Sequence, residues 1–315
     1  MAKPGIVSDE LSSANYAGNM RFYALPDKIF LAVVNVMIGI FGLIVLYPLI
    51  YIVSMSFSSV TAVMEGRVWL WPVDITLVGY EAVFKNTFII SGYGNSLIYM
   101  VFATVVCVMM TMICAYPLTR NFKLRGFFMF LLTFTMFFSG GLIPTYMLIS
   151  RLGLINSRLV MVLPGALSAW NVIVTRTFIK TTISDELREA ADLDGCGDIR
   201  YLFHIVFPLS KAIIAVVALW TAVGSWNAYF SAMLYLQNKA MWPLQMILRE
   251  ILILNQMTGN MTSTTVSAAE MSRRIALREL LKYSLIIVAS VPLLIMYPFV
   301  QKYFVKGVML GSIKG

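Results

Sequence analysis

Charged residues are scarce in this sequence. Only 12% of its 315 residues are Asp, Glu, Lys or Arg, while 59% are hydrophobic. A soluble domain typically carries about 25% charged residues. The low charge therefore excludes an ordinary soluble domain and indicates a chain that is solvated mainly by lipid.

Cysteine and histidine are also few. The cysteines are Cys107, Cys114 and Cys196, and the single histidine is His204. No Cys-x-x-Cys pair or Cys/His spacing of a zinc site occurs, so neither a disulfide framework nor a structural metal is predicted. We expect the cysteines to be small buried residues, and we expect no cofactor.

Motifs of nucleotide binding and of hydrolysis are missing. No G-x-x-x-x-G-K-[ST] run is present, so the chain cannot hold ATP phosphates in the P-loop manner. Neither G-x-S-x-G nor H-E-x-x-H occurs. The formal net charge is +9, but no basic stretch is interleaved with exposed aromatic residues, so nucleic acid is not expected as a partner. We predict a protein that is not an enzyme.

Long apolar runs take the place of charge. A helix needs about 20 mostly apolar residues to cross a bilayer. Six stretches qualify, at 29–57, 95–118, 127–149, 159–178, 212–236 and 283–299. They predict an all-α integral membrane protein with six transmembrane helices in residues 29–304. The tails would be residues 1–28 and 305–315.

The distribution of basic residues predicts the orientation. If the N-terminus is cytoplasmic, more than half of the 24 Lys and Arg residues fall on the inner side, as expected for membrane proteins. The clearest signal is the short loop 119–126, which carries Arg120, Lys123 and Arg125. Both termini are therefore predicted to be cytoplasmic.

Two long loops are predicted outside the membrane, at 58–94 and 237–282. The first carries Trp69 and Trp71, which suit an interfacial aromatic belt. The second begins with an amphipathic stretch, 242–255, whose apolar residues recur at helical spacing. This stretch could lie on the membrane, dock to a partner or pack against its own bundle.

A carrier driven by an ion gradient is the main alternative class. Such carriers often keep a carboxylate inside the membrane, because a charge there is costly and is retained for function. The six predicted spans contain no Asp or Glu. This favours motion imposed from outside the chain. Backbone carbonyls can also bind ions, so the alternative stays open.

The polar loop 180–211 is the most informative segment. Ser184 is a good N-cap for a first helix, and the acidic residues that follow it suit the first turn. Glycines at 195 and 197 interrupt that helix, and Asp198 can cap a second helix that leads back into the membrane. The loop therefore predicts a short helix, a turn and a second helix.

This shape suits docking to another protein. Ala190 and Ala191 are small, so a partner surface could approach closely. Glu189 and Asp194 offer carboxylates to a basic partner. On physical grounds alone, an ordinary connecting loop explains the segment equally well.

The same segment resembles the EAA loop of permease subunits of binding-protein-dependent ABC importers, whose pattern is E-A-A-x3-G-x9-I-x-L-P. The matching residues are Glu189, Ala190, Ala191, Gly195, Ile205 and Pro208. Phe207 stands where the pattern has Leu. In that family the loop forms a coupling helix that sits in a groove of the ATPase. The resemblance implies an ATPase-coupling role for these residues and for Asp194.

Other segments resemble the carbohydrate class of these permeases, notably the lipoprotein-associated sugar permease group of Gram-positive bacteria. They are 225–236, 242–251 and 297–315. The resemblance implies a type I importer permease in the bacterial cell membrane, similar to the maltose-importer subunits. It also implies three kinds of partner: a second permease, expected to be a different chain, two copies of an ATPase subunit, and an extracellular solute-binding protein.

A sugar substrate needs hydroxyl partners and flat aromatic faces. Residues of these types in the spans are Trp226, Asn227, Tyr229, Trp170, Asn171 and Asn35. Sequence neighbours do not share a helix face, so only part of the set can line one cavity. Helix–helix packing is the alternative for each. We predict a neutral sugar, most simply an oligosaccharide, while a peptide importer would share the same loop.

Overall fold

The computed structural model describes residues 25–259 and 268–312, and these are helical or irregular with no strand among them. Three helices are long and apolar enough to cross a membrane unaided: α2 (Leu25–Phe57), α5 (Thr87–Ala115) and α15 (Ala268–Ser312). The spans predicted at 29–57 and 283–299 lie inside α2 and α15.

Three further spans are bent pairs of helices. Their members are α6 (Arg125–Phe137) with α7 (Leu142–Arg151), then η2 (Arg158–Met161) and η3 (Leu163–Gly165) with α8 (Ala169–Thr182), and finally the segment Asp198–Leu209 with α12 (Lys211–Trp226). The bends measure 114°, 49° and 82°. If each bent pair is one span, the described chain has six, in agreement with the predicted number.

The helices outside these spans and outside the loop 180–211 contain 16 residues or fewer. They are α3 (Val60–Met64), α4 (Val78–Lys85), η1 (Pro117–Thr119), α13 (Tyr229–Tyr235), η5 (Lys239–Met241) and α14 (Leu244–Gly259). The predicted loop 58–94 therefore contains α3, α4 and the start of α5. Helix α5 begins at Thr87, before the start predicted at Asn95, because Asn86 caps it. The side-chain oxygen of Asn86 accepts a hydrogen bond from Phe88 N at 3.0 Å.

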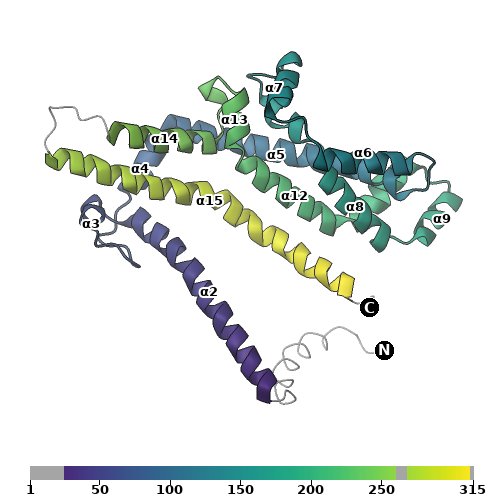
Figure 1. Ribbon diagram of the computed structural model, residues 1–315, viewed down its shortest axis with the longest axis horizontal. Coiled ribbons are helices and arrows are strands. Elements are labelled where there is room, and N and C mark those ends of the chain that lie inside the picture. Colours follow the sequence, from purple (N-terminus) through teal and green to yellow (C-terminus); the bar gives the residue numbers. More distant parts are fainter. Residues whose placement is uncertain (1–24, 260–267, 313–315) are drawn as a thin grey trace, which may run out of the picture.

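Helix α5 is the axis of the bundle. It packs along α12, α8 and α14 (Figure 1). One buried cluster surrounds Met112 and Val206 near the Tyr116 end of α5, and another surrounds Ile89 and Trp226 near its Thr87 end. The two ends of α5 are thus fixed by different parts of the chain.

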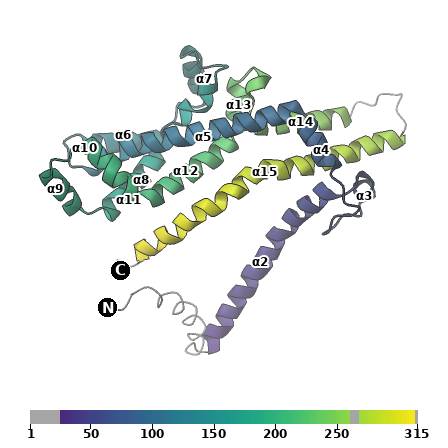
Figure 2. The ribbon, with the colours of Figure 1, turned by 180° about the vertical axis from the view of Figure 1, so that it is seen from behind.

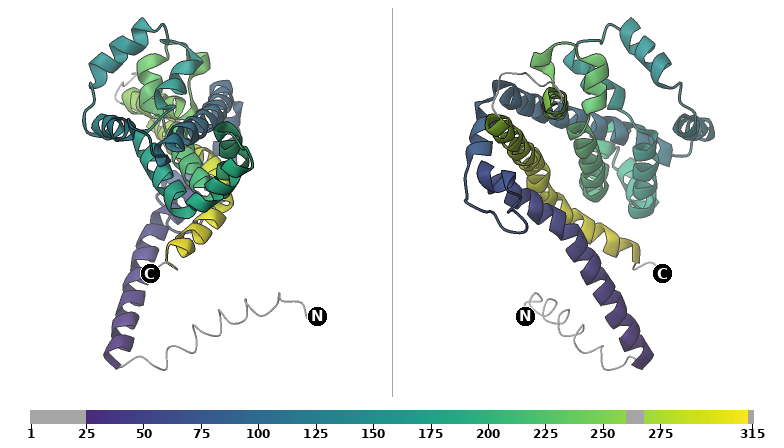
Figure 3. Two further views of the ribbon diagram at one scale, coloured as in Figure 1. Left: turned by 90° about the vertical axis from the view of Figure 1, so that its right-hand side faces the viewer. Right: turned by 60° about the vertical axis from the view of Figure 1, so that its left-hand side comes forward.

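Helix α2 stands apart from this bundle. It meets the rest of the chain near Phe57 and diverges from it toward Leu25 (Figure 1, Figure 3). Tyr51 packs edge-on against Tyr283 of α15 with ring centroids 5.9 Å apart. Helix α15 lies between α2 and α12 (Figure 2). The apolar surface of α2 therefore faces lipid or another subunit.

The amphipathic stretch 242–255 packs against its own bundle. It forms most of α14, in which Leu244, Ile247 and Leu248 are buried in the cluster around Trp226. On its polar side, Glu250 pairs with Lys239 at 2.6 Å. Of the three predicted alternatives, which were lying on the membrane, docking to a partner and packing against its own bundle, the last accounts for the buried residues of this stretch.

Backbone carbonyls of segment 240–242 hold the Thr87 end of α5. Asn95 Nδ2 donates to Ala240 O at 2.8 Å and to Trp242 O at 3.1 Å. Tyr99 Oη donates to Met241 O at 2.8 Å. These bonds join residues more than 140 positions apart in sequence, so they fix the fold of the bundle at this end.

Candidate functional site

The first half of the loop 180–211 is a short helix closed by a glycine turn. Ser184 is the N-cap of α9 (Asp185–Leu193), with φ −70° and ψ 148°. Gly195 has a φ of +73°, in the left-handed region that glycine adopts without strain. Backbone hydrogen bonds from Gly195 and Cys196 to carbonyls of α9 complete a Schellman motif. The predicted helix and glycine turn are confirmed.

The second half of the loop returns to the bundle in three pieces: α10 (Asp198–Tyr201), the π-helical turn η4 (Leu202–Val206) and α11 (Phe207–Leu209). A π-helical turn is rare and often marks a functional position. Ile205 is half-buried in this segment and Pro208 is exposed. The helix axis then turns by 82° into α12.

The motif residues on α9 divide between two sides. Glu189, Ala190 and Asp194 are exposed, whereas Ala191 is buried in the cluster that includes Met112. The helix therefore anchors itself through Ala191, while the carboxylates of Glu189 and Asp194 lie exposed and can face a partner.

Two apolar side chains of the loop were missed from sequence. Leu193 is 90% exposed and Ile199 is 76% exposed. They flank the Gly195 turn, so together they form an apolar tip on an otherwise polar loop. The sequence carried the signal for this tip, because Leu193 and Ile199 are large apolar residues in a mostly polar loop. Exposed apolar side chains of this kind mark interaction surfaces.

Arg188 lies at the centre of a hydrogen-bonded network beneath α9. Its Nε donates to Asp192 Oδ2 at 3.0 Å, its Nη2 pairs with Asp198 Oδ1 at 3.0 Å, and its Nη1 donates to Tyr116 Oη at 3.1 Å. Tyr116 Oη in turn donates to Asp198 Oδ1 at 2.9 Å. The guanidinium carbon lies 4.7 Å from the ring centroid of Tyr201.

This network corrects the predicted capping role of Asp198 and explains how the charge of Arg188 is stabilised. Asp198 is the first residue of α10 and not its cap, which is Gly197, because the Asp198 carboxylate binds Tyr116 and Arg188. Burial acts to lower the pKa of Arg188, but Tyr116 and the carboxylates of Asp192 and Asp198 raise it above its ordinary value. The guanidinium is therefore charged.

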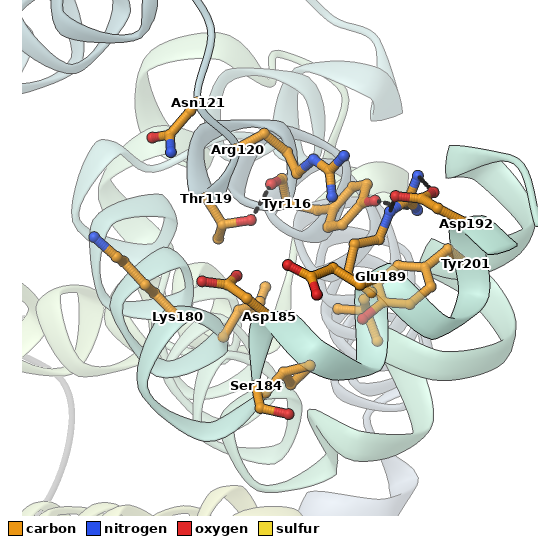
Figure 4. A pocket seen from close by; sticks show the side chains of 14 residues that line it. Tyr116, Thr119, Arg120, Asn121, Lys180, Ser184, Asp185, Glu189, Asp192 and Tyr201 are labelled. Atoms are coloured by element: carbon orange, nitrogen blue, oxygen red, sulfur yellow. Dashed lines mark hydrogen bonds and ion pairs between the residues drawn. The ribbon is translucent and has the colours of Figure 1, made fainter.

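A cavity of about 500 Å³ opens between α9, the end of α8 and the segment after α5. Figure 4 shows the carboxylates of Asp185 and Glu189 turned toward the same space, with Arg120 across from them. The charged side chains in its lining carry both signs: Arg120, Lys180, Arg188, Asp185, Glu189 and Asp192. Such a lining suits a partner with charged side chains.

A second cavity, of about 320 Å³, lies in the middle of the bundle between α5, α8 and α12. Asn171 and Trp220 line it, and the described residues around it include no charged side chain. The hydroxyl of Ser225 is buried there without a hydrogen-bond partner in the described part of the chain. The cavity therefore offers polar but uncharged groups.

The other residues predicted on a substrate pathway are scattered. Trp226 is fully buried and donates from Nε1 to Ala289 O at 3.1 Å. Asn227 is exposed and donates to Val223 O of its own helix at 2.9 Å. The remaining three are exposed on different helices: Trp170 on α8, Tyr229 on α13 and Asn35 on α2. Only Asn171 of the six lines the cavity in the middle of the bundle.

Residues 107–309 match the family described as binding-protein-dependent transport system inner membrane component. The match covers well over half of the chain. The chain belongs to this family. It is a multi-pass permease subunit of an ABC importer, and it is a transport subunit and not an enzyme.

Curated relatives support the assignment along most of the permease. Protein LplC of Bacillus subtilis is 37% identical over 279 residues, covering 88% of this chain and 92% of LplC. The polygalacturonan/rhamnogalacturonan transport system permease protein YtcP of the same bacterium is 36% identical over 293 residues, covering 92% of this chain and all of YtcP. The resemblance found in the sequence is confirmed.

A solved structure has the same fold. It is a bacterial ABC transporter involved in the import of the acidic polysaccharide alginate, and one of its chains matches with a TM-score of 0.79 and 35% identity. The match covers 90% of this permease and 99% of that chain. A permease of this family works with an ATPase, a solute-binding protein and a second permease, so the exposed loop and the cavities belong to a larger assembly.

Proposed function

We propose that this permease forms half of the transmembrane pathway of an ATP-driven oligosaccharide importer. The observation that carries the proposal is that two similar proteins with a stated cargo, YtcP and the alginate importer, are named for polysaccharides. Each matches at least 90% of this chain at 35% identity or more. The second permease is a different chain, two ATPase copies bind the cytoplasmic side, and an extracellular binding protein delivers the sugar.

The cavity in the middle of the bundle supports contact with a sugar. Trp220 is 43% exposed and offers an aromatic face, and Asn171 offers an amide. The Ser225 hydroxyl is enclosed in the cavity wall without a hydrogen-bond partner in the described part of the chain, so it can bond a sugar hydroxyl once the wall opens. The lining described for it is uncharged, which favours the neutral sugar predicted from sequence over a charged one. The acidic polysaccharides named for YtcP and for the alginate importer favour a charged sugar instead, so the charge of the sugar is the first property to test.

Calorimetry on the partner binding protein decides the substrate class. The panel contains neutral glucose and galactose oligosaccharides, galacturonic-acid oligosaccharides and peptides. Binding of an oligosaccharide supports the proposal, and the charge of the tightest ligand settles neutral against acidic. Binding of a peptide and of no sugar would overturn the carbohydrate assignment.

Uptake into liposomes that contain the full complex tests the cavity. Ser225→Ala should lower uptake of the oligosaccharide found by calorimetry about two- to tenfold, the value of one hydrogen bond. Ser290→Ala is the matched control, because its hydroxyl bonds to Ile286 O on α15 and does not line the cavity. Equal uptake by the two variants would remove Ser225 from the pathway.

We propose that α9 and its flanking turn dock into the ATPase. The exposed carboxylates of Glu189 and Asp194 and the apolar tip of Leu193 and Ile199 support this role, because charge and exposed apolar groups together suit a protein partner. Ala190 lies exposed beside Glu189, so a partner surface can approach α9 closely there.

Gly195→Trp tests the docking. The bulky side chain would stand in open space on the free loop, but the positive φ is unfavourable for it and the partner would meet it. We expect the ATPase to be lost on co-purification. Gly195→Asn is the control, since Asn tolerates the left-handed region. An intact complex with Gly195→Trp would refute the docking site.

The energy source follows from the family and can be checked directly. Uptake should require ATP on the cytoplasmic side and should continue when a protonophore collapses the ion gradient. Uptake that stops with the protonophore and persists without ATP would favour the secondary carrier.

The arrangement of the helix ends supports cytoplasmic termini. The Leu25 end of α2 and the Ser312 end of α15 both point away from α3 and α4 and toward the side of the chain that carries α9 (Figure 1, Figure 2). If α9 meets a cytoplasmic ATPase, both ends are cytoplasmic. Cysteines introduced at Lys28 and Lys306 should then react with a membrane-impermeant maleimide only after the membrane is opened.

A further inference from the structure

Most of the Arg188 side chain is withdrawn from solvent, with only its edge reaching the cavity beneath α9. Its side chain is 12% exposed, although it belongs to α9, whose neighbouring residues Glu189 and Ala190 are exposed. A charged side chain is costly to bury unless it is fully paired. The hydrogen bonds of Arg188 are therefore made mainly within this chain.

The partners of Arg188 come from three elements. Asp192 belongs to α9 itself, Asp198 and Tyr201 belong to α10, and Tyr116 is the residue at which α5 ends. The guanidinium thus joins both arms of the loop to the end of α5. Its planar fork can hold several partners in fixed directions at once, which a lysine cannot.

Helix α5 leads from this network to the cavity in the middle of the bundle. Ala103 and Cys107 of the same continuous helix line that cavity. Cys107 and Tyr116 are nine residues apart, about 14 Å along a helix. A displacement of Tyr116 along the helix axis is therefore transferred to the cavity wall without a flexible joint between them.

We propose that Arg188 is a positioning residue that transmits the movement of α9 to the cavity. With Tyr116 and Asp198 it forms a clamp that makes the coupling loop and α5 move as one body. This inference rests on the proposed docking of α9 to the ATPase. Without the clamp, α9 would still bind the ATPase, but its movement would not open the cavity.

The test uses the complete transporter in liposomes with a reporter thiol. Cys107, Cys114 and Cys196 are replaced by Ala, and Ser168→Cys places a thiol in the cavity wall. A membrane-impermeant maleimide is added outside, with and without internal ATP and vanadate. In the parent we expect ATP and vanadate to raise the labelling rate, since closure of the ATPase pair opens the cavity outward.

Two clamp variants are compared with a control. Arg188→Lys keeps the charge but loses the fork, and Tyr116→Phe removes only a hydroxyl. Both should lower the ATP-dependent labelling about tenfold, as loss of charge-assisted hydrogen bonds implies, while the ATPase still co-purifies. Arg125→Lys is the control, because Arg125 bonds to Asn121 in another loop.

The outcomes separate the clamp from the docking. Parental labelling in both clamp variants would overturn the clamp, and so would loss of the ATPase from both. Gly195→Trp tests the docking in the same background: if it keeps the ATPase and the ATP-dependent labelling, the proposed docking site fails whatever Arg188 does.

Discussion

The two halves of α5 are held in different ways. At the Thr87 end, neutral side chains of Asn95 and Tyr99 donate to backbone carbonyls of segment 240–242. At the Tyr116 end, charged side chains bond mainly to other side chains, with Arg188 at the centre.

This difference separates contacts of α5 that belong to the fixed fold from contacts that a single substitution can weaken. A backbone carbonyl moves only when its whole segment moves, so the Thr87 end belongs to the fold. A side-chain network depends on a few groups and can be weakened by one substitution while the helices stay packed. We therefore expect substitutions at the Thr87 end to change stability and substitutions at the Tyr116 end to change coupling.

The largest effect is expected from Trp226→Ala at the Thr87 end. Trp226 is fully buried, meets the ring of Tyr93 at 5.5 Å and donates to Ala289 O. Loss of this side chain should lower the free energy of unfolding by about 3–5 kcal/mol. Thermal unfolding of the purified complex measures it. A variant with parental stability and failed sugar uptake would restore the substrate-contact role predicted for Trp226 from sequence.

A smaller effect is expected from Gly92→Ala. A Cβ at Gly92 would collide with the side chain of Ile247 and lie 3.3 Å from backbone atoms of Leu244. Overpacking of this kind should cost about 1–3 kcal/mol. Gly94→Ala is the matched control, since its Cβ would meet nothing within 4 Å. If both variants unfold at the same temperature, the close packing of α14 on α5 is not a constraint.

The smallest stability effect sharpens the comparison most. Tyr99→Phe and Tyr116→Phe each remove one hydroxyl, the first in the Thr87 half of α5 and the second at its Tyr116 end. Tyr99→Phe should destabilise the complex by about 1 kcal/mol and leave ATP-dependent labelling of the cavity unchanged. Tyr116→Phe should leave the stability of the complex nearly unchanged and should lower the ATP-dependent labelling of the cavity. Identical profiles for the two variants would show that the ends of α5 do not differ in role.

Local signals in the sequence predicted the loop well. The start of α9 after Ser184 and the turn at Gly195 depend on residues within a few positions, and both are confirmed, although the Ser184 side chain makes no capping hydrogen bond. The same is true of α2, whose apolar run needs no partner to be read as a span. The number of spans followed from composition in the same way.

Features that depend on distant residues could not be predicted. Arg188 reads as an ordinary loop charge until Tyr116, 72 positions earlier, is brought beside it. Trp226 reads as a candidate sugar contact until Ala289 lies next to its indole nitrogen. The 114° bend in the third span is centred on Gly140 and Gly141, but only the fold shows that these glycines turn the chain instead of continuing the helix.

The pairing of α2 with α15 sets an order of events during synthesis. Ser56 of α2 accepts a hydrogen bond from Ser284 of α15, which follows 228 residues later. At about 5–20 residues per second, the ribosome needs roughly 10 to 45 s to make the partner after the first helix is complete. Throughout that time α2 lacks its partner α15 and contacts only segments made earlier, such as Leu70 and Tyr80. A helix that waits this long for its partner must be compatible with lipid on most sides, and the predominantly apolar surface of α2 meets that requirement.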